Sequence, residues 1–413
     1  MQWLKEIPSH WDEKRAKYIY QKQNRIPEEN DDVITCFRDG EVTLRKNRRI
    51  TGFTESFKEI GYQGIKKGDL VIHQMDAFAG ATGVSDSDGK GTPVYSVCTP
   101  IDGQSLTKYH AMVIRLMGLN GFIQSLYRGI RERSSDFRFE TFARQFLPLP
   151  PLAEQEKIVS YLENKTSKID AYVADKEKEI VLLQELKQKT IADAVTKGLS
   201  PDAKMKDSGI SWIGEIPEHW EVRHLSQVSY EHYISNKEVH HQNLLSLSYG
   251  RIIRKDINTT EGLLPASFDT YQIVEEGNIV MRLTDLQNDH KSLRVGLVKE
   301  EGIVTSAYVC LGVYDSVYPS YLYNVLHSYD IKKLFYSMGG GLRQNLNWQG
   351  LKKLDIPLPP VNEQQAIVAY IEEKCEKIDK LASELQSEID YLKEYKQRLI
   401  ADCVTGQVNV SGV

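Results

Sequence analysis

A repeat of 209 residues constrains the fold of this chain more than any other feature of its sequence. FLPLPPLAEQEKIVSYL begins at Phe146, and DIPLPPVNEQQAIVAYI begins at Asp355. The same offset aligns EIPSHW, which ends at Trp11, with EIPEHW, which ends at Trp220, and it aligns KQKTIADAVT with KQRLIADCVT. Because the aligned motifs run through a whole half-chain, the sequence predicts two copies of one structural unit.

A run without Gly or Pro follows each Pro-Pro dipeptide, at 153–196 and 362–404. Apolar residues recur there at three-, four- and seven-residue intervals: Leu162, Ile169, Val173, Ile180, Leu183 and Ile191 in the first run, and Ile371, Ile378, Leu381, Leu385, Ile389, Leu392 and Leu399 in the second. This spacing is typical of coiled-coil helices, each roughly 65 Å long at about 1.5 Å per residue. The short linker around 198–211 favours antiparallel pairing, so we expect a pseudo-two-fold relation between the halves.

The segments between the repeated motifs differ between the copies and predict mixed α/β domains. Short runs rich in β-branched and aromatic residues indicate strands, namely GDLVIHQ, TPVYSVC, HAMVIRL, GNIVMRL, GLVKEE and SAYVCLGVY. GFIQSLYRGIRE and PSYLYNVLHSYDIKKLFYSMG indicate short helices. We therefore expect an α+β chain with a first domain at 1–147, a long helix at 148–198, a second domain at 199–356, and a second long helix with a tail at 357–413.

Composition argues against several classes of protein. No apolar run reaches about 18 residues and MQWLKEIPSHW lacks a leader pattern, so we expect a cytoplasmic chain without a membrane span. The five cysteines are scattered without a C-x-x-C pair, which argues against a disulfide framework and a zinc site. The net charge of −5 gives no general attraction to nucleic acid, although residues 1–147 alone carry +3. We expect neither a metal nor a cofactor.

The paired IPxHW segments, the PLPPxxEQ junctions and the GDLV-like strands together resemble the specificity subunits of type I restriction-modification enzymes. The resemblance covers the whole chain and lies in the duplicated order of the motifs. It implies two target-recognition domains separated by two long helices. It also implies double-stranded DNA, two modification (methyltransferase) subunits and an ATP-dependent restriction subunit as partners. In such a complex this chain would select a bipartite, asymmetric DNA sequence, and the partners would methylate adenine or cleave.

The residues permit this division of labour, because the motifs of the catalytic partners are absent. An adenine methyltransferase would carry N-P-P-Y or D-P-P-Y/F, and a translocase would carry G-x-x-x-x-G-K-S/T; the sequence contains neither. MGGGLRQN, from Met338 to Asn345, lacks the Lys-Ser/Thr pair of a phosphate-binding loop. We therefore expect no catalytic residues in this chain.

Candidate DNA contacts are side chains that can donate to phosphates or read base edges. In the first half they are Arg45, Lys46, Asn47, Arg48 and Arg49 in one basic run, His73 after an apolar strand, and Arg131, Arg133 and Arg138 before the junction. In the second half they are Arg251, Arg254, Lys255, Arg282, Lys291, Arg294, Arg343, Gln344, Asn345 and Asn347. Arg282 occupies the position of His73 in the repeat. A solvated or salt-bridged surface is the alternative for every one of them.

Two further readings remain open beside DNA recognition. The chain could be a non-enzymatic scaffold whose coiled coil organises two protein-binding domains, although a scaffold gives no reason for divergent inserts on a duplicated frame. A stand-alone methyltransferase is opposed by the missing motifs. For the junctions, a structural role is favoured over partner contact by Glu154 and Glu363, since Pro ends a strand and begins a helix. Trp11 and Trp220 are expected in the cores.

Overall fold

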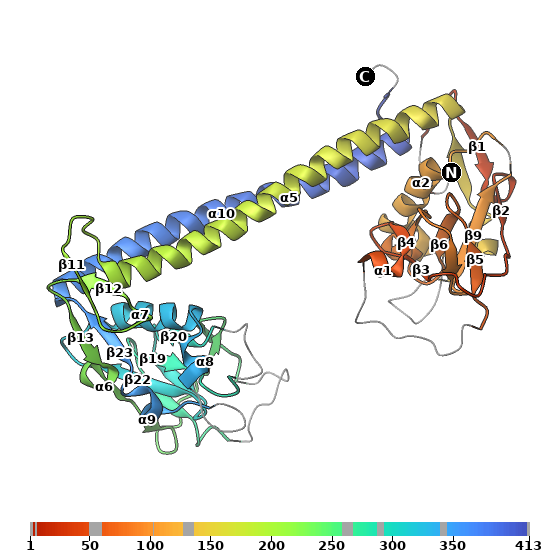
Figure 1. The fold of residues 1–413 in the computed structure, drawn as a ribbon. Coiled ribbons are helices and arrows are strands. Elements are labelled where there is room, and N and C mark those ends of the chain that lie inside the picture. Colours follow the sequence, from red (N-terminus) through yellow and green to blue (C-terminus); the bar gives the residue numbers. More distant parts are fainter. Residues whose placement is uncertain are drawn as a thin grey trace. The chain divides into compact units, whose positions relative to one another are not determined.

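The structure of the chain is a computed structural model, and it describes residues 3, 4, 6–48, 60–101, 103–126, 136–257, 267–286, 293–338 and 345–410. The chain divides into two compact units. Unit 1 is Met1–Lys176 with Ser387–Val413, and unit 2 is Glu177–Gln386. Each unit combines one insert with parts of both long helices (Figure 1). The units thus differ from the four consecutive segments predicted above, because both long helices contribute to both units.

Unit 1 contains an antiparallel sheet in the order β2-β9-β6-β7, the smaller pairs β3-β4 and β5-β8, and the pair β1-β10 at the junction with the long helix. Its elements are β1 (Asp12–Arg15), η1 (Ala16–Tyr18), β2 (Tyr20–Lys22), β3 (Ile34–Cys36), β4 (Val42–Leu44), α1 (Arg45–Arg48), β5 (Gln63–Ile65), β6 (Leu70–His73), η2 (Ala77–Ala79), β7 (Thr82–Val84), β8 (Gly89–Gly91), β9 (Tyr95–Pro100), α2 (Thr107–Leu119), α3 (Phe122–Ser125), α4 (Phe139–Phe142) and β10 (Phe146–Leu149).

Unit 2 repeats this topology. Its main sheet has the order β14-β22-β19-β20, and β13-β23 replaces β1-β10. Its elements are β11 (Met205–Asp207), β12 (Glu215–Pro217), β13 (Glu221–His224), α6 (Leu225–Val228), β14 (Ser229–Glu231), β15 (Ile234–Ser235), β16 (Leu245–Ser248), β17 (Arg251–Arg254), β18 (Gln272–Val274), β19 (Ile279–Met281), β20 (Val295–Leu297), β21 (Gly302–Val304), β22 (Val309–Val313), α7 (Pro319–Ile331), α8 (Leu334–Met338), α9 (Trp348–Leu351) and β23 (Asp355–Leu358). The inserts therefore share a fold although their sequences agree little.

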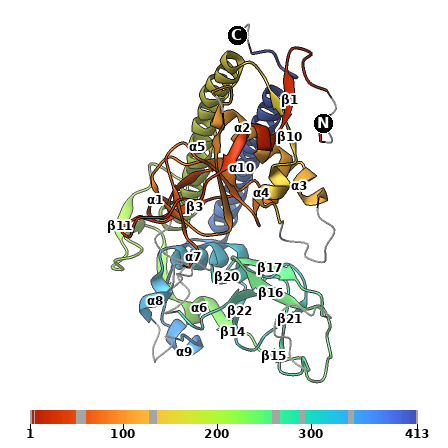
Figure 2. The same ribbon diagram turned by 90° about the vertical axis from the view of Figure 1, so that its right-hand side faces the viewer.

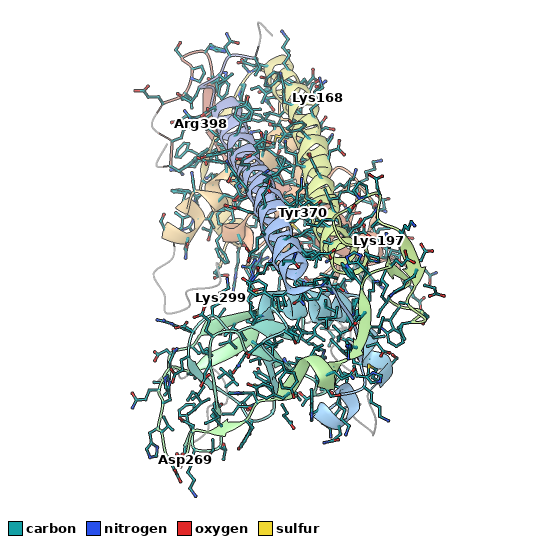
Figure 3. All side chains as sticks on the ribbon, turned by 90° about the vertical axis from the view of Figure 1, so that its left-hand side faces the viewer. Lys168, Lys197, Asp269, Lys299, Tyr370 and Arg398 are labelled. Carbon is teal, nitrogen blue, oxygen red and sulfur yellow. The ribbon has the colours of Figure 1, made fainter. Side chains whose placement is uncertain are left out.

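Leu70–Ile72 of β6 and all of β19 are apolar because both faces of these strands are covered. Leu70 and Ile72 of β6 pack in the core that includes α2, whereas Val71 packs on the opposite side with β3 and β9. In β19, Ile279 and Met281 face the α7 side and Val280 faces away. Figure 2 shows α7 beside β20 and the hairpin β16–β17, and in Figure 3 Asp269 lies at the end of unit 2 away from the helices.

The two long helices are α5 (Leu152–Lys197) and α10 (Val361–Val404), and within each unit they run antiparallel. In unit 1, Lys396 Nζ lies 2.6 Å from both carboxylate oxygens of Asp170. The repeat counterparts meet in unit 2, where Lys187 Nζ lies 2.6 Å and 2.7 Å from the carboxylate oxygens of Asp379. The predicted fold class, with mixed α/β domains and an antiparallel coiled coil, is confirmed.

The apolar stripe predicted for the helices lies largely between them. Ile371, Leu385, Ile389 and Leu399 are buried, and Ile378 and Leu392 are half-buried. Leu381 is 41% exposed and lies outside the stripe, because the seam advances by alternating steps of three and four residues and passes from Ile378 to Ala382.

The PLPPxxEQ junctions lock each insert to the long helix that follows it. Gln155 is buried, accepts a hydrogen bond from Leu106 N (2.8 Å) and donates to Gln104 O and Pro150 O. Gln364 makes the same three bonds in unit 2, with Tyr318 N, Ser316 O and Pro359 O. The Glu of each motif accepts from the His of the IPxHW segment, His10 with Glu154 at 2.9 Å and His219 with Glu363 at 2.8 Å. Trp11 and Trp220 are buried. These contacts give the junction a structural role.

Replacing Gln364 with Leu should lower the free energy of unfolding by about 2 to 4 kcal/mol, because three backbone groups, one buried and two partly buried, would lose their partner. The matched control is Gln365→Leu, the same substitution at the exposed neighbouring position. Urea unfolding of the full chain measures both. Equal midpoints for the two variants would show that the buried amide does not stabilise the junction.

One predicted strand is wrong. HAMVIRL, residues 110–116, lies inside α2 instead of forming a strand. The burial of Tyr109, Val113 and Met117 at four-residue steps explains the difference, since this face packs against β6, β7 and η2. A seven-residue apolar run is too short to distinguish the period of a helix from that of a strand.

Candidate nucleic-acid interface

The basic run of unit 1 follows β4 and forms the single turn α1. Lys46 Nζ lies 2.5 Å from Asp32 Oδ2, and Asn47 donates to Thr43 Oγ1 at 2.8 Å. Arg48 stacks over Phe37 and pairs with Asp39 (2.7 Å) and Glu41 (2.8 Å), and the hydrogen bond with Asp39 raises the pKa of Arg48. Arg45 donates to Thr35 Oγ1 at 3.3 Å, and Arg49 lies outside the described residues. Folding therefore brings carboxylates to a run that has none in sequence.

His73 is the last residue of β6, and its side chain contacts the loop that follows the strand. Its Nδ1 accepts from Asp76 N at 3.1 Å, its Nε2 lies 3.6 Å from Asp76 Oδ2, and its ring meets the edge of Tyr95. Burial lowers the pKa of His73, so the imidazole is neutral at pH 7. Arg38 binds the other oxygen of Asp76 at 2.8 Å. These contacts fix the position of the His73 side chain at the end of the strand.

The third group of unit 1 candidates lies before the junction. Arg138 precedes α4, and its Nε donates to Asp136 Oδ1 at 2.7 Å on an exposed surface. Arg131 and Arg133 lie outside the described residues.

In unit 2 the hairpin β16–β17 carries three candidates. Its two-residue turn places Tyr249 (φ 46°) and Gly250 (φ 76°) in the left-handed region that tight hairpins require. Arg254 holds Glu300 at 2.7 Å and 2.8 Å through Nε, which lowers the pKa of Glu300. Arg251 and Lys255 are exposed, and no carboxylate of the described residues forms an ion pair with either.

The remaining candidates surround the loop after β19. Arg282 is half-buried and its side chain has no ion pair among the residues that the structure describes. Arg294 is fully buried, and its guanidinium donates to backbone carbonyls of residues 282–285. Asn345 Oδ1 accepts from Asp285 N at 2.9 Å, and Asn347 caps α9 by accepting from Gly350 N at 3.1 Å. Lys291, Arg343 and Gln344 lie outside the described residues.

Sequence reasoning missed two residues of these regions. Tyr249 stands at the hairpin tip, 79% exposed, and the Tyr-Gly pair between SLS and RIIR was the available turn signal. Arg115 on α2 donates through Nη1 to Arg38 O and Gly80 O, both at 2.8 Å, and burial lowers the pKa of its guanidinium. Nothing in HAMVIRL distinguishes an arginine that braces a loop from one that faces solvent.

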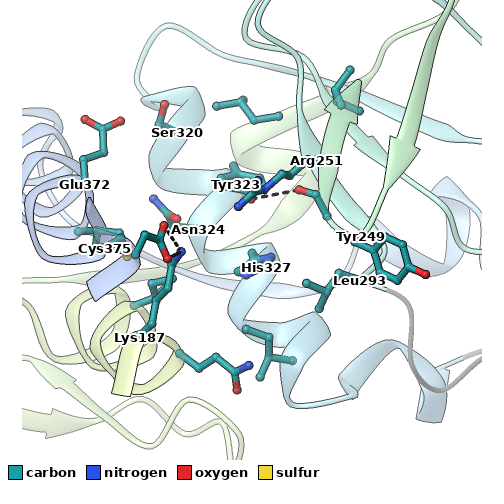
Figure 4. Close-up of a pocket in the computed structure, with 18 of the residues that line it drawn as sticks. Lys187, Tyr249, Arg251, Leu293, Ser320, Tyr323, Asn324, His327, Glu372 and Cys375 are labelled. Atoms are coloured by element: carbon teal, nitrogen blue, oxygen red, sulfur yellow. Dashed lines mark hydrogen bonds and ion pairs between the residues drawn. The ribbon is translucent and has the colours of Figure 1, made fainter. Parts of the chain in front are cut away.

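A groove of about 730 Å³ in unit 2 opens between the hairpin, α7 and both long helices (Figure 4). Arg251, Tyr323, His327 and Cys375 line it, together with the Lys187–Asp379 ion pair. Burial lowers the pKa of His327 to about 4 and raises the pKa of Tyr323 and of Cys375, so these three groups are uncharged at pH 7. The groove offers hydrogen-bonding surface and one exposed guanidinium rather than an activated nucleophile.

Among the described residues, no three His, Cys, Asp or Glu side chains gather to hold a metal ion. Nor does any helix of this part of the chain combine the length and apolarity needed to cross a bilayer.

Residues 295–391 match the protein family described as Type I restriction modification DNA specificity domain, from β20 into α10. The chain is also 25% identical over 284 residues to the Type I restriction enzyme MjaVIII specificity subunit of Methanocaldococcus jannaschii. The alignment covers 65% of this chain and 63% of that relative, less than two thirds of its length.

Two solved structures share the fold across nearly the whole chain. One, from work on complex assembly and conformational transition of the type I R-M system, has a TM-score of 0.71 at 15% identity and covers 98% of this chain and 100% of its own. The HsdS subunit from Thermoanaerobacter tengcongensis has a TM-score of 0.55 at 15% identity, with 98% and 99% covered.

Proposed function

Because the chain is a relative of the specificity subunits of type I restriction-modification enzymes, we propose that it selects the DNA sequence on which separate subunits act. The target is double-stranded, bipartite and asymmetric, and each unit reads one half of it. Two modification subunits, one per unit, methylate adenine at the selected site, and a restriction subunit cleaves unmodified DNA. The chain itself is non-catalytic and works in the cytoplasm.

One observation carries this proposal: the two units repeat a fold while the side chains at equivalent places differ. At the end of the central strand, β6 has His73 and the repeat position after β19 has Arg282. On the helix beside the sheet, both copies have a buried tyrosine: Tyr109 donates to Val404 O, and Tyr321 donates to Pro357 O at 2.8 Å and lies 3.4 Å from Val195 O, whereas Arg115 is replaced by His327. A protein that reads two different half-sites needs a constant frame with variable side chains of this kind.

Arg251, Lys255 and Arg282 are the strongest candidates for DNA contact, because no carboxylate of the described residues neutralises them. The basic run at Arg45–Arg48 and the paired Arg254 and Arg138 come second. Exposed ion pairs are weak, so a phosphate can replace the carboxylate, but the exchange gains less than binding to an unpaired cation. His73, Asn345 and Asn347 would act from positions held by their own loops. The candidates Arg49, Arg131, Arg133, Lys291, Arg343 and Gln344 remain proposals from the sequence.

Arg251→Gln should lower the slope of log binding constant against log salt by about 0.9, and Arg251→Gln with Lys255→Gln by about 1.8, if each cation contacts one phosphate. The matched control is Arg254→Gln in the same strand, where Glu300 already neutralises the charge and the slope should change by less than half as much. Titration at several salt concentrations on a non-cognate duplex measures all three. Equal slopes for Arg251→Gln and the wild type would assign Arg251 to solvated surface.

The function itself is tested by selecting bound sequences from a random duplex library with the full chain and its modification subunit. We expect two short conserved blocks of different sequence, separated by unread bases. Recovery of a single block, or of no preferred sequence, would contradict sequence recognition by two units. A protein-binding scaffold would give the second of these results.

A further inference from the structure

Arg294 is a fully buried cation directly before β20, and its guanidinium donates to backbone oxygens and to a tyrosine hydroxyl. Nη1 donates to Arg282 O at 3.1 Å and to Thr284 O at 2.9 Å, and Nη2 donates to Asp285 O at 3.3 Å. Nε donates to the Tyr336 hydroxyl at 3.0 Å, and the guanidinium carbon lies 5.3 Å from the ring centre of Tyr336. Since a buried charge must be compensated, these bonds fix the geometry around it.

Arg294 belongs to a hydrogen-bonded cluster that joins three segments distant in sequence. The first is 282–286, which follows β19; the second is α8, which carries Tyr336; and the third is the stretch at Asn345 and Leu346. That third stretch joins the cluster through Asn345 Oδ1, which accepts from Asp285 N, and Leu346 N, which donates to Leu283 O at 2.9 Å. Asp285 has φ 56°, a backbone conformation that persists in a side-chain-bearing residue only where the surroundings hold it. The cluster therefore holds the chain on both sides of 287–292 and of 339–344.

We propose that Arg294 is a positioning residue that determines specificity: it fixes the loop after β19, which carries Arg282, against the stretch at Asn345, and it does not contact the DNA. The inference deepens the function proposed above and rests on it. The chemistry favours arginine at this place, because its planar fork serves several carbonyls at once and a lysine ammonium cannot reach all of them in the same geometry. The bases read by Arg282 and Asn345 would then depend on a side chain that touches no base.

In unit 1 a different arginine stabilises the corresponding loop, which follows β6. Arg115 reaches from α2 to Gly80 O and Arg38 O, and Arg38 binds Asp76, the repeat counterpart of Asp285. The two units thus stabilise the loop after the central strand with an arginine from different elements. Arg115 provides a matched control, because its replacement should affect the other half of the target.

The test uses the full chain with its modification subunit and compares wild type, Arg294→Lys, Tyr336→Phe and Arg115→Lys. For each, the measurements are binding to the selected site, to sites with one base changed in either half, and to a scrambled duplex at several salt concentrations. Thermal unfolding is measured in parallel. We expect Arg294→Lys to reduce discrimination at least tenfold in the half-site of unit 2 and less than twofold in the other half. Its salt slope on the scrambled duplex should stay at the wild-type value. Arg115→Lys should show the reverse pattern.

Tyr336→Phe removes the bond from Arg294 Nε to the hydroxyl and keeps the ring, so it should reduce discrimination in the same half-site by a smaller factor, and it carries the test if Arg294→Lys does not fold. Unchanged discrimination in a folded Arg294→Lys would overturn the inference alone. Equal loss in both half-sites would also overturn it, since it would indicate a general effect on the fold. A lowered salt slope would show that Arg294 itself contacts phosphate. Failure of the wild type to prefer any sequence would overturn the proposed function as well.

Discussion

Exchanging residues 16–145 for the corresponding insert of another relative should change the sequence of one half-site completely and leave the other half-site unaltered. The boundaries follow from the structure: β1 pairs with β10, and Ala16 N donates to Gln145 O just inside that pair. The constant strands thus remain with the constant helices. Selection of bound sequences before and after the exchange measures the effect.

The exchanged insert must supply the contacts that attach it to the frame. Tyr109 donates to Val404 O at 2.8 Å, and Gln155 needs the backbone around Leu106 as its partner. An exchange that lacks the tyrosine should fold poorly, and this variant serves as the control for attachment. Altered bases in both half-sites after a well-folded exchange would contradict independent reading by the two units.

Removing one heptad from each long helix should shorten the gap between the half-sites by two to four base pairs. A heptad spans about 10.5 Å at about 1.5 Å per residue, close to three base pairs at about 3.4 Å each. Deleting 179–185 together with the repeat counterpart 388–394 keeps the seam in phase. It also retains Lys187 with Asp379 and Lys396 with Asp170, because both helices lose seven residues between these pairs.

Binding of the shortened protein should also weaken. Three base pairs turn one half-site by about 100° around the duplex at about 10.5 base pairs per turn. The measurement is selection from a library of gap lengths. A control with four residues removed from each helix rotates the seam and should lower stability. An unchanged preferred gap with undiminished affinity would mean that the helices do not set the spacing.

The long helices could be predicted because their apolar period repeats over a long segment. The main strands could be predicted because a strand that is buried on both faces reads as a continuous apolar run. The seam at Ile371, Leu385 and Leu399 follows a seven-residue step, and GDLVIHQ and GNIVMRL both formed central strands. The helix α2 was missed because its strongest apolar run is short. Alignment of Tyr109 with Tyr321 in the better-defined α7 was the signal that could have identified it.

The candidate site could be predicted only as a set of residue types. Arg48 meets Asp39 and Glu41 because β3 and β4 fold back on each other, and Arg254 meets Glu300 across 46 residues of chain. Arg294 was predicted to contact DNA, yet the structure buries it completely. Partner and burial depend on the packing of distant segments, which a charge pattern does not contain.

The division of the chain between the two units has a consequence for folding during synthesis on the ribosome. Unit 2 is one continuous stretch, so it can fold as soon as residue 386 has left the exit tunnel. Unit 1 cannot, since Leu399, Cys403 and Val404 belong to its core. The first insert to be made is therefore the last to be completed, and until then it exposes the apolar surface that these residues cover. A premature stop codon shortly after residue 386 would leave the C-terminal recognition unit intact and damage the N-terminal one, more than 200 residues upstream.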